Sequence, residues 1–76
     1  MKTITESKLI SKRGLKPYSI SLNDCDSHIT PFSTHIKVYT DEGHFFESGD
    51  YCYTLTDAME SFTRRCKDND TQETGS

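Results

Sequence analysis

The chain has 76 residues, a hydrophobic fraction of 32% and a formal net charge of −3. A chain of this length forms one domain and buries only about 60% of the surface that its unfolded form exposes. The length therefore excludes a deep catalytic cleft, and we expect a small core that gains stability from self-association or from a partner.

Charge is unevenly distributed along the chain. Residues 1–22 hold five basic side chains and one acid, whereas residues 23–76 hold four basic side chains and eleven acids. This pattern fits two solvated faces, or a bipolar surface that steers the protein toward an oppositely charged macromolecule. No secretory segment follows Met1 and no apolar run approaches the ~18 residues of a membrane span, so we expect a cytoplasmic protein without a membrane segment.

Residues 1–15 form an ambiguous arm. Ile4, Leu9 and Ile10 could make one stripe of a short helix closed by Gly14, which we favour, or they could belong to a strand. In residues 16–22, apolar side chains alternate with serines, which predicts a strand with one apolar face. Residues 23–33 are a long polar connection, and loops of this length are often functional.

Residues 34–53 predict a hairpin. Ile36 and Val38 alternate with polar residues in a strand over residues 34–40, and Gly43 can adopt the positive φ that a short turn at residues 41–43 requires. The return strand covers residues 44–53, and Gly49 in its interior predicts a β-bulge.

A capped amphipathic helix over residues 55–67 follows. Thr54 is suited to the N-cap, and one face of the helix carries a stripe of apolar side chains expected in the core: Leu55, Ala58, Met59, Phe62 and Cys66. The predicted fold is α+β, with an antiparallel sheet of about three strands and this helix packed on one face. We expect a single domain over residues 1–67 and a disordered tail over residues 68–76.

A metal site is the first chemical hypothesis. Cys25 and His28 have a spacing that could pinch zinc, but a structural zinc site shows two such pairs and only one is present. Three widely spaced cysteines are better interpreted as thiols of a cytosolic protein. No nucleophile lies in a recognisable turn and the acids are scattered, so we expect no metal, no cofactor and no enzymatic activity.

Nucleic-acid binding has support in a basic arm over residues 8–16 and in Arg64, Arg65 and Lys67. Against it, the pI of about 5.5 is far below the value of about 9 typical of such domains, and cations at a helix end complement the helix dipole. A regulator that binds nucleic acid through the arm is therefore the alternative and not the leading hypothesis.

Aromatic and acidic residues of the hairpin favour protein binding. Phe45 and Phe46 are adjacent on a strand and must face opposite sides of a sheet that one helix covers, so one of them should stay exposed. The arm could cover this face; otherwise a second copy or a foreign protein does. The expected partner-binding residues are Tyr39, Asp41, Glu42, Phe45, Glu47, Asp50 and Tyr51.

About half of the chain carries a pattern of motifs: Phe32-Ser-Thr-His35, Gly43, Phe46, Gly49-Asp50-Tyr51 and Leu55-Thr-Asp-Ala58, with Phe62 and Arg64. This pattern resembles small orphan proteins of phages and other mobile elements. Many proteins of that kind are anti-defence factors, including anti-CRISPR and anti-restriction inhibitors that bind a host nuclease complex without chemistry of their own. The resemblance implies a class of function and assigns no residue.

The sequence thus predicts a non-enzymatic protein-binding module, an inhibitor of a host defence nuclease complex that acts by steric or electrostatic masking. Acids at the hairpin could occupy a basic nucleic-acid channel of the partner, while exposed aromatic side chains could mask it sterically. A homodimeric structural protein that buries the open sheet face is a further alternative.

Overall fold

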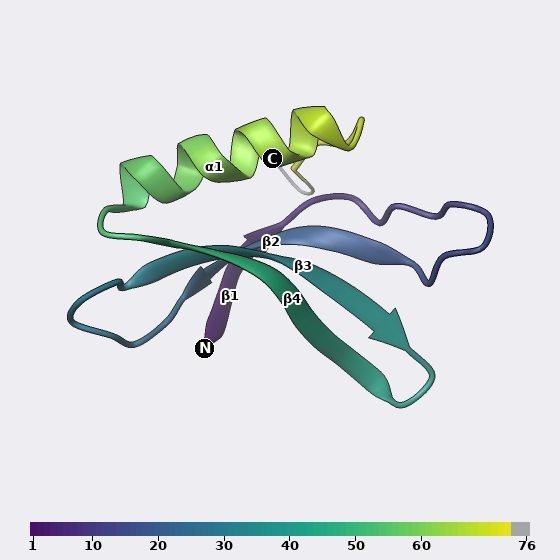
Figure 1. The fold of residues 1–76 in the computed structure, drawn as a ribbon, viewed down its shortest axis with the longest axis horizontal. Helices are drawn as coiled ribbons and strands as arrows, with labels where there is room; N and C mark the ends of the chain where they lie inside the picture. The colour runs from purple at the N-terminus through teal and green to yellow at the C-terminus, as the bar shows by residue number, and fades with distance from the viewer. Residues whose placement is uncertain (74–76) are drawn as a thin grey trace.

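The computed structural model describes residues 1–73. It contains four strands and a helix: β1 (Lys2–Glu6), β2 (Tyr18–Asp24), β3 (Phe32–Thr40), β4 (Gly43–Cys52) and α1 (Leu55–Asp68). The strands form one antiparallel sheet in the order β1-β2-β3-β4, and α1 lies over one face of it (Figure 1). The predicted α+β fold is confirmed, with four strands in the sheet where the sequence predicted about three.

The additional strand, β1, comes from the first residues of the arm, and the rest of the arm connects β1 to β2. The short helix that the apolar stripe favoured does not form. β1 pairs with β2 from Lys2↔Asp24 to Glu6↔Ser21, and the register shifts between Thr3 and Thr5. The strand is more stable than the helix because β1 can form backbone hydrogen bonds with the free edge of β2, whereas a helix this short has only marginal stability by itself. Gly14, with φ of +84°, belongs to the connection between β1 and β2.

The hairpin between β3 and β4 follows the prediction closely. Its turn consists of Asp41 and Glu42, and Gly43 takes the expected positive φ, at +135°. The register of β3 and β4 shifts opposite His35, which places the predicted bulge at Gly49. A Cβ atom at Gly49 would lie 2.5 Å from Nε2 of His35, so the bulge fits only glycine without rearrangement.

The helix begins where predicted. Thr54 is the N-cap, and its hydroxyl accepts a hydrogen bond of 3.1 Å from the backbone N–H of Asp57. The buried stripe differs from the predicted one, because Leu55 and Met59 are 42% and 52% exposed. Ser61 is buried in their place.

The reason for the rotated stripe lies in the sheet below it. The Ser61 hydroxyl is 2.9 Å from the hydroxyl of Thr34 on β3 and donates to the carboxylate of Asp50 on β4 at 2.6 Å. These bonds satisfy polar groups that β3 and β4 place under the helix, and turning Ser61 inward turns Leu55 and Met59 outward. Apolar periodicity alone does not reveal such a contact.

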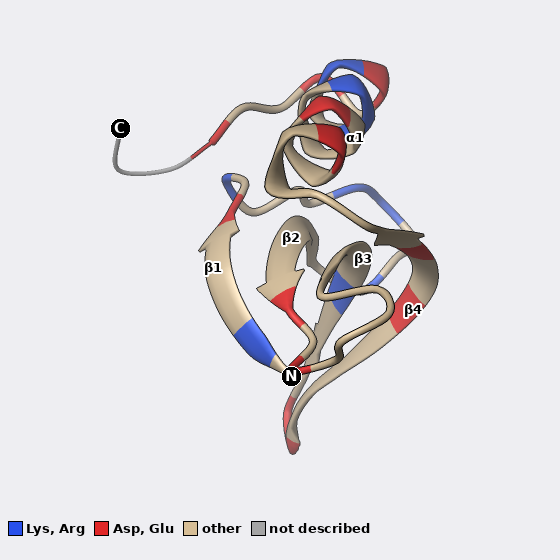
Figure 2. Cartoon of the chain, turned by 90° about the vertical axis from the view of Figure 1, so that its left-hand side faces the viewer, with Lys and Arg blue, Asp and Glu red and all other residues tan. Residues whose placement is uncertain are grey.

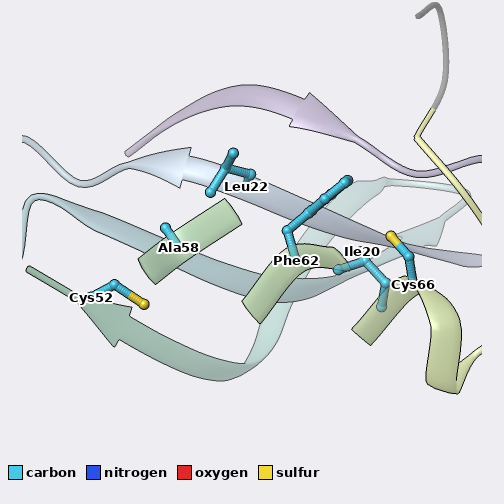
Figure 3. Packing of buried hydrophobic residues seen from close by; sticks show 6 residues of the cluster. All are labelled: Ile20, Leu22, Cys52, Ala58, Phe62 and Cys66. Carbon is cyan, nitrogen blue, oxygen red and sulfur yellow. The ribbon is translucent and has the colours of Figure 1, made fainter. Parts of the chain in front are cut away.

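The apolar core lies between α1 and the strands β2, β3 and β4, the strands that the helix contacts. Figure 3 shows its buried members, which are Ile20, Leu22, Cys52, Ala58, Phe62 and Cys66. Phe32 and Ile36 pack against this cluster from β3. The core is small, as the length of the chain predicts.

The opposite face of the sheet is polar and equally buried. Its central side chains, all no more than 5% exposed, are Ser19, Ser21, Asn23, Ser33 and His35. Larger side chains of the sheet extend over them: Tyr39 on β3 reaches across β2 and donates to the carboxylate of Glu6 on β1 at 2.8 Å. We call this the polar face.

The segment after the helix lies against the connection between β1 and β2. Lys8 donates its backbone N–H to the carbonyl of Gln72 at 2.9 Å, and Ser7 forms an isolated bridge with Glu73. The sequence predicted a disordered tail over residues 68–76. In the structure Asp68 is the last residue of α1, and Gln72 and Glu73 make the contacts just described. Residues 74–76 lie outside the described part of the chain.

Candidate functional site

The hairpin carries all seven side chains that the sequence singled out, but the structure distributes them over three places. Asp41 and Glu42 form the turn at its tip. By strand alternation, Phe45, Glu47 and Asp50 lie on the side of the sheet that carries α1, whereas Tyr39 and Tyr51 lie on the polar face. The residues therefore do not form one patch.

The part of the hairpin beyond the helix carries an open apolar hollow. In Figure 1 the tip of the hairpin extends away from α1, so the helix does not cover it. The hollow has a volume of about 280 Å³ and lies between the end of the helix, the β1–β2 connection and the hairpin. Its lining residues are Leu15, Lys16, Tyr18, Ile36, Val38, Phe45, Glu47 and Asn69.

Two of these apolar side chains are exposed to water. Phe45 is 45% exposed and Leu15 is 60% exposed, and they come from opposite sides of the hollow. Phe46 faces the other side of the sheet, where it is half-buried against His35 and His44. The expectation that one of the two phenylalanines stays exposed is met by Phe45. The contribution of Leu15 was not predicted, because its neighbours Gly14, Lys16 and Pro17 give no strand or helix pattern.

Acidic side chains lie at the tip of the hairpin and along β4, and one of them, Glu47, lines the hollow. Figure 2 shows acidic positions at the tip of the hairpin and along β4, whereas the hairpin's basic position, Lys37, is on β3. Asp50 is held by Ser61 and by Arg64, whose Nη2 is 3.9 Å from its carboxylate, so it serves the fold. Asp41, Glu42 and Glu47 are exposed, and within residues 1–73 none of them forms an ion pair. These three carboxylates are the ones available to a partner.

The polar face contains a hydrogen-bonded histidine, His35, for which the sequence predicted no structural role. Nδ1 of His35 lies 3.3 Å from the amide nitrogen of Asn23 and 3.1 Å from the hydroxyl of Ser33. Because an amide NH₂ group only donates, Nδ1 accepts and the ring proton is on Nε2, which faces the Tyr51 hydroxyl at 3.4 Å. Burial, and next the positive charge of Arg65, lowers the pKa of His35 below its ordinary value of 6.5.

This histidine belongs to a closed structural network. Asn23 also donates to Ser21 at 3.1 Å, and the thiol of Cys25 donates to Ser33 at 3.1 Å. The neutral ring has its hydrogen-bonding atoms occupied by residues of the sheet, which leaves no substrate position between them. We therefore assign the network to the fold. Alternation of serine with isoleucine and leucine was the only signal for it in the sequence.

The two tyrosines of the polar face, Tyr39 and Tyr51, also contact other residues of the sheet. Tyr39 donates to both carboxylate oxygens of Glu6, at 3.0 and 2.8 Å, and Lys37 is 3.6 Å from the same carboxylate. Tyr51 lies edge-on to His35, with ring centroids 5.4 Å apart, although its side chain remains 58% exposed. Tyr39 and Tyr51 thus close the polar face, and we do not include them in the candidate surface.

The cysteines and the possible metal ligands lie apart from one another. No three histidine, cysteine, aspartate or glutamate side chains of residues 1–73 gather into a set that could hold a metal ion. Cys25, Cys52 and Cys66 are free thiols. Burial raises the pKa of Cys52 and of Cys66, and the nearby carboxylates of Asp50 and Glu73, respectively, raise it further.

The basic arm is a loop that connects β1 to β2. Its cations, which support the alternative of nucleic-acid binding, are exposed: Lys8, Lys12, Arg13 and Lys16. Lys16 is the one that reaches the rim of the apolar hollow. The arm therefore places a positive charge on one side of the hollow and β4 places Glu47 on the other.

No protein-family model, no curated protein and no solved structure matches this chain. In residues 1–73 the helix is too short and too polar to cross a membrane. The assignment of a function therefore depends on the geometry of the hairpin.

Proposed function

We propose that this chain is a non-enzymatic protein-binding module that inhibits its partner by masking a basic surface with the β3–β4 hairpin. One observation carries the proposal: the uncovered end of the hairpin combines exposed carboxylates with an open apolar hollow. We call the set of Asp41, Glu42, Phe45 and Glu47, together with Leu15 beside it, the hairpin surface.

Charge supports a basic partner. Residues 41–52 contain four acids and no lysine or arginine, and three of those acids are exposed without an ion pair in the described chain. A local field of one sign accelerates association with an oppositely charged surface and disfavours wrong partners. The net charge of the whole chain, −3, adds little, so the effect is local to the hairpin.

The apolar hollow supports a protein partner. Exposed aromatic and aliphatic side chains next to a hollow are typical anchors of protein interfaces, where a few buried residues supply most of the binding energy. Phe45 and Leu15 provide such an anchor beside the charged side chains of Lys16 and Glu47. A partner side chain inserted between them would remove both from water.

A nuclease complex of the anti-defence class fits these requirements. Channels that bind nucleic acid are lined by lysine and arginine, because phosphate neutralisation dominates their affinity. An acidic hairpin that occupies such a channel blocks it without any chemistry of its own. The proposed activity is therefore loss of nucleic-acid binding by the partner when the hairpin is bound.

The test is a capture experiment with two matched charge-reversal variants. Tagged wild-type protein, Glu42→Lys/Glu47→Lys and the control Glu60→Lys/Asp68→Lys are incubated with lysate of the organism that carries the gene, and bound proteins are identified by mass spectrometry. Both variants change the charge equally, but the control positions are exposed on α1. We expect a partner that wild type and control retain and the hairpin variant loses.

The captured partner is then purified and its binding to nucleic acid is measured with and without the chain. Inhibition by the wild type and the control, but not by the hairpin variant, is the expected result. If all three proteins capture the same set, or if the partner binds nucleic acid equally well in their presence, the proposal is wrong.

A further inference from the structure

The two edges of the sheet differ in how well they are protected. β1 is five residues long, interrupted by a register shift, and carries Lys2; beyond it, Ser7 and Lys8 are paired with the segment after the helix. Short strands, bulges and lysine are the features by which proteins prevent unwanted strand addition. The outer edge of β4 lacks them over residues 43–47, where the register is regular and no proline, lysine or arginine occurs.

Backbone groups of this edge point outward. The two-residue turn makes Thr40 and Gly43 the closing hydrogen-bonded pair, so alternation directs the N–H and C=O groups of His44 and Phe46 away from β3. The same alternation directs the N–H of Tyr39 toward β2, and it donates to the carbonyl of Pro17 at 2.9 Å. Within the described chain no strand lies beyond β4, so residues 43–47 offer an open pairing edge.

Farther along, the strand is closed to pairing in another way. The bulge at Gly49 breaks the regular register, and Arg65 donates to the carbonyl of Ser48 at 2.6 Å. A bulge twists an edge and stops a ladder. The open part of β4 is therefore limited to residues 43–47, directly beside the apolar hollow that Phe45 and Glu47 line.

Charge decides what can occupy this edge. If two copies paired antiparallel through residues 43–47, centred on Phe45, Glu47 of one copy would lie opposite Gly43 of the other, next to Glu42, and acids would meet acids. A foreign strand with lysine or arginine at its ends and an apolar side chain in its middle would meet Glu47, the acidic turn and Phe45 favourably. Complementary charge thus argues for a basic foreign segment.

We propose that the outer edge of β4, over residues 43–47, accepts an extended lysine- or arginine-bearing segment of the partner protein as a fifth strand of the sheet. This inference rests on the proposed function and specifies how the partner is held. Main-chain hydrogen bonds to His44 and Phe46 give the affinity, and the side chains of Phe45 and Glu47 give the specificity. The central apolar side chain of the added strand packs against the exposed ring of Phe45, at the outer side of the hollow.

The probe is the peptide Lys-Thr-Val-Thr-Lys, fused to the C-terminus of the full chain through a flexible Gly-Ser linker. Tethering supplies an effective concentration of about millimolar, so weak pairing is detectable. The matched control carries Glu-Thr-Val-Thr-Glu on the same linker. Amide hydrogen exchange and nuclear magnetic resonance shifts of His44 and Phe46 are measured at low protein concentration, and the free chain is measured at rising concentration.

We expect the lysine peptide to slow exchange of the His44 and Phe46 amides at least about tenfold relative to the glutamate peptide. His44→Pro removes an outward N–H at a position where an edge tolerates proline, and should abolish the effect. Glu47→Lys keeps the backbone intact and should reverse the preference between the two peptides.

Equal exchange with both peptides, or protection that appears at β1 instead, overturns the inference. So does protection of His44 and Phe46 in the free chain as its concentration rises, because a second copy would then occupy the edge. The proposed function fails separately: the capture experiment depends on exposed charge, whereas tethered pairing is measured without the partner.

Discussion

The two faces of the sheet are both buried, but by different means. On the side of α1, apolar side chains such as Ile20 and Phe62 are removed from water by a helix. On the polar face, Asn23, Ser33 and His35 are removed from water by side chains of the strands themselves, and each is hydrogen-bonded. The comparison shows that a chain with few apolar residues can bury polar side chains if those side chains form hydrogen bonds with one another.

The largest loss of stability is expected from a substitution in the apolar core. Phe62→Ala removes a side chain that is 6% exposed at the centre of the core, and replacements of this kind destabilise by about 3 to 5 kcal/mol. In a domain this small we expect most of the cooperative unfolding transition to be lost in urea, measured by circular dichroism. Met59→Ala is the control, because Met59 is 52% exposed and its removal should change the midpoint little.

A smaller effect tests the rigidity of the polar face. In Gly49→Ala the new methyl group meets Nε2 of His35, which Asn23 and Ser33 hold in place, and overpacking of this kind destabilises by about 1 to 3 kcal/mol. Urea denaturation measures the change. In a His35→Ala background the same substitution should destabilise far less; an equal effect in both backgrounds would show that the contact does not matter.

The hydrogen bonds of Ser61 beneath the helix are expected to contribute less to stability. Ser61→Ala removes the hydroxyl that bridges Thr34 and Asp50, and the loss of such a bond destabilises by about 1 kcal/mol. Thr63→Ala, at an exposed position of the same helix, is the matched control in thermal denaturation. Identical melting temperatures for the two variants would contradict our account of why the helix turns Ser61 inward.

Acid should weaken the polar face selectively. The pKa of His35 is lowered in the folded protein, so near and below the ordinary value of 6.5 the unfolded chain binds more protons and stability falls as pH falls. We expect the difference in stability between about pH 7.5 and about pH 5.5 to be smaller in His35→Gln than in the wild type, as measured by urea midpoints. A wild type and variant with the same pH dependence would exclude this role for His35.

The smallest expected difference is in the reactivity of the thiols near the two faces of the sheet. Cys52 and Cys66 are buried in the apolar core with raised pKa values, whereas Cys25 is half-buried beside Ser33. Iodoacetamide reacts with thiolates, so Cys25 should be alkylated first in the native protein, as followed by peptide mass spectrometry. Simultaneous labelling of all three cysteines would indicate that the core opens on the timescale of the reaction.

Local signals made the hairpin and the helix predictable. Gly43, Gly49 and Thr54 each have a conformational or hydrogen-bonding reason to stand where they do, and each occupies the predicted position in a turn, a bulge or a cap. β1 was not predictable in the same way, because its state depends on the partner edge of β2. Short apolar runs do not distinguish helix from strand without that tertiary information.

The hairpin surface was predictable from the sequence only in part. Exposure of one phenylalanine follows from strand alternation and a single helix, but which one is exposed depends on where the helix ends. Leu15 and the hollow arise from the packing of the β1–β2 connection near the hairpin, which no local pattern encodes. The hydrogen bonds of Tyr39 and Asp50 were likewise invisible, because their partners lie far away in the sequence.

The order of the strands also bears on how the chain reaches its native state. Each strand pairs with its neighbour in the sequence, and the β3–β4 turn has only two residues, so this hairpin has the smallest loop-closure entropy. Docking of α1 on β2 joins segments much farther apart. Early formation of the β3–β4 hairpin would therefore expose its open edge to other nascent chains before the helix covers any part of the sheet.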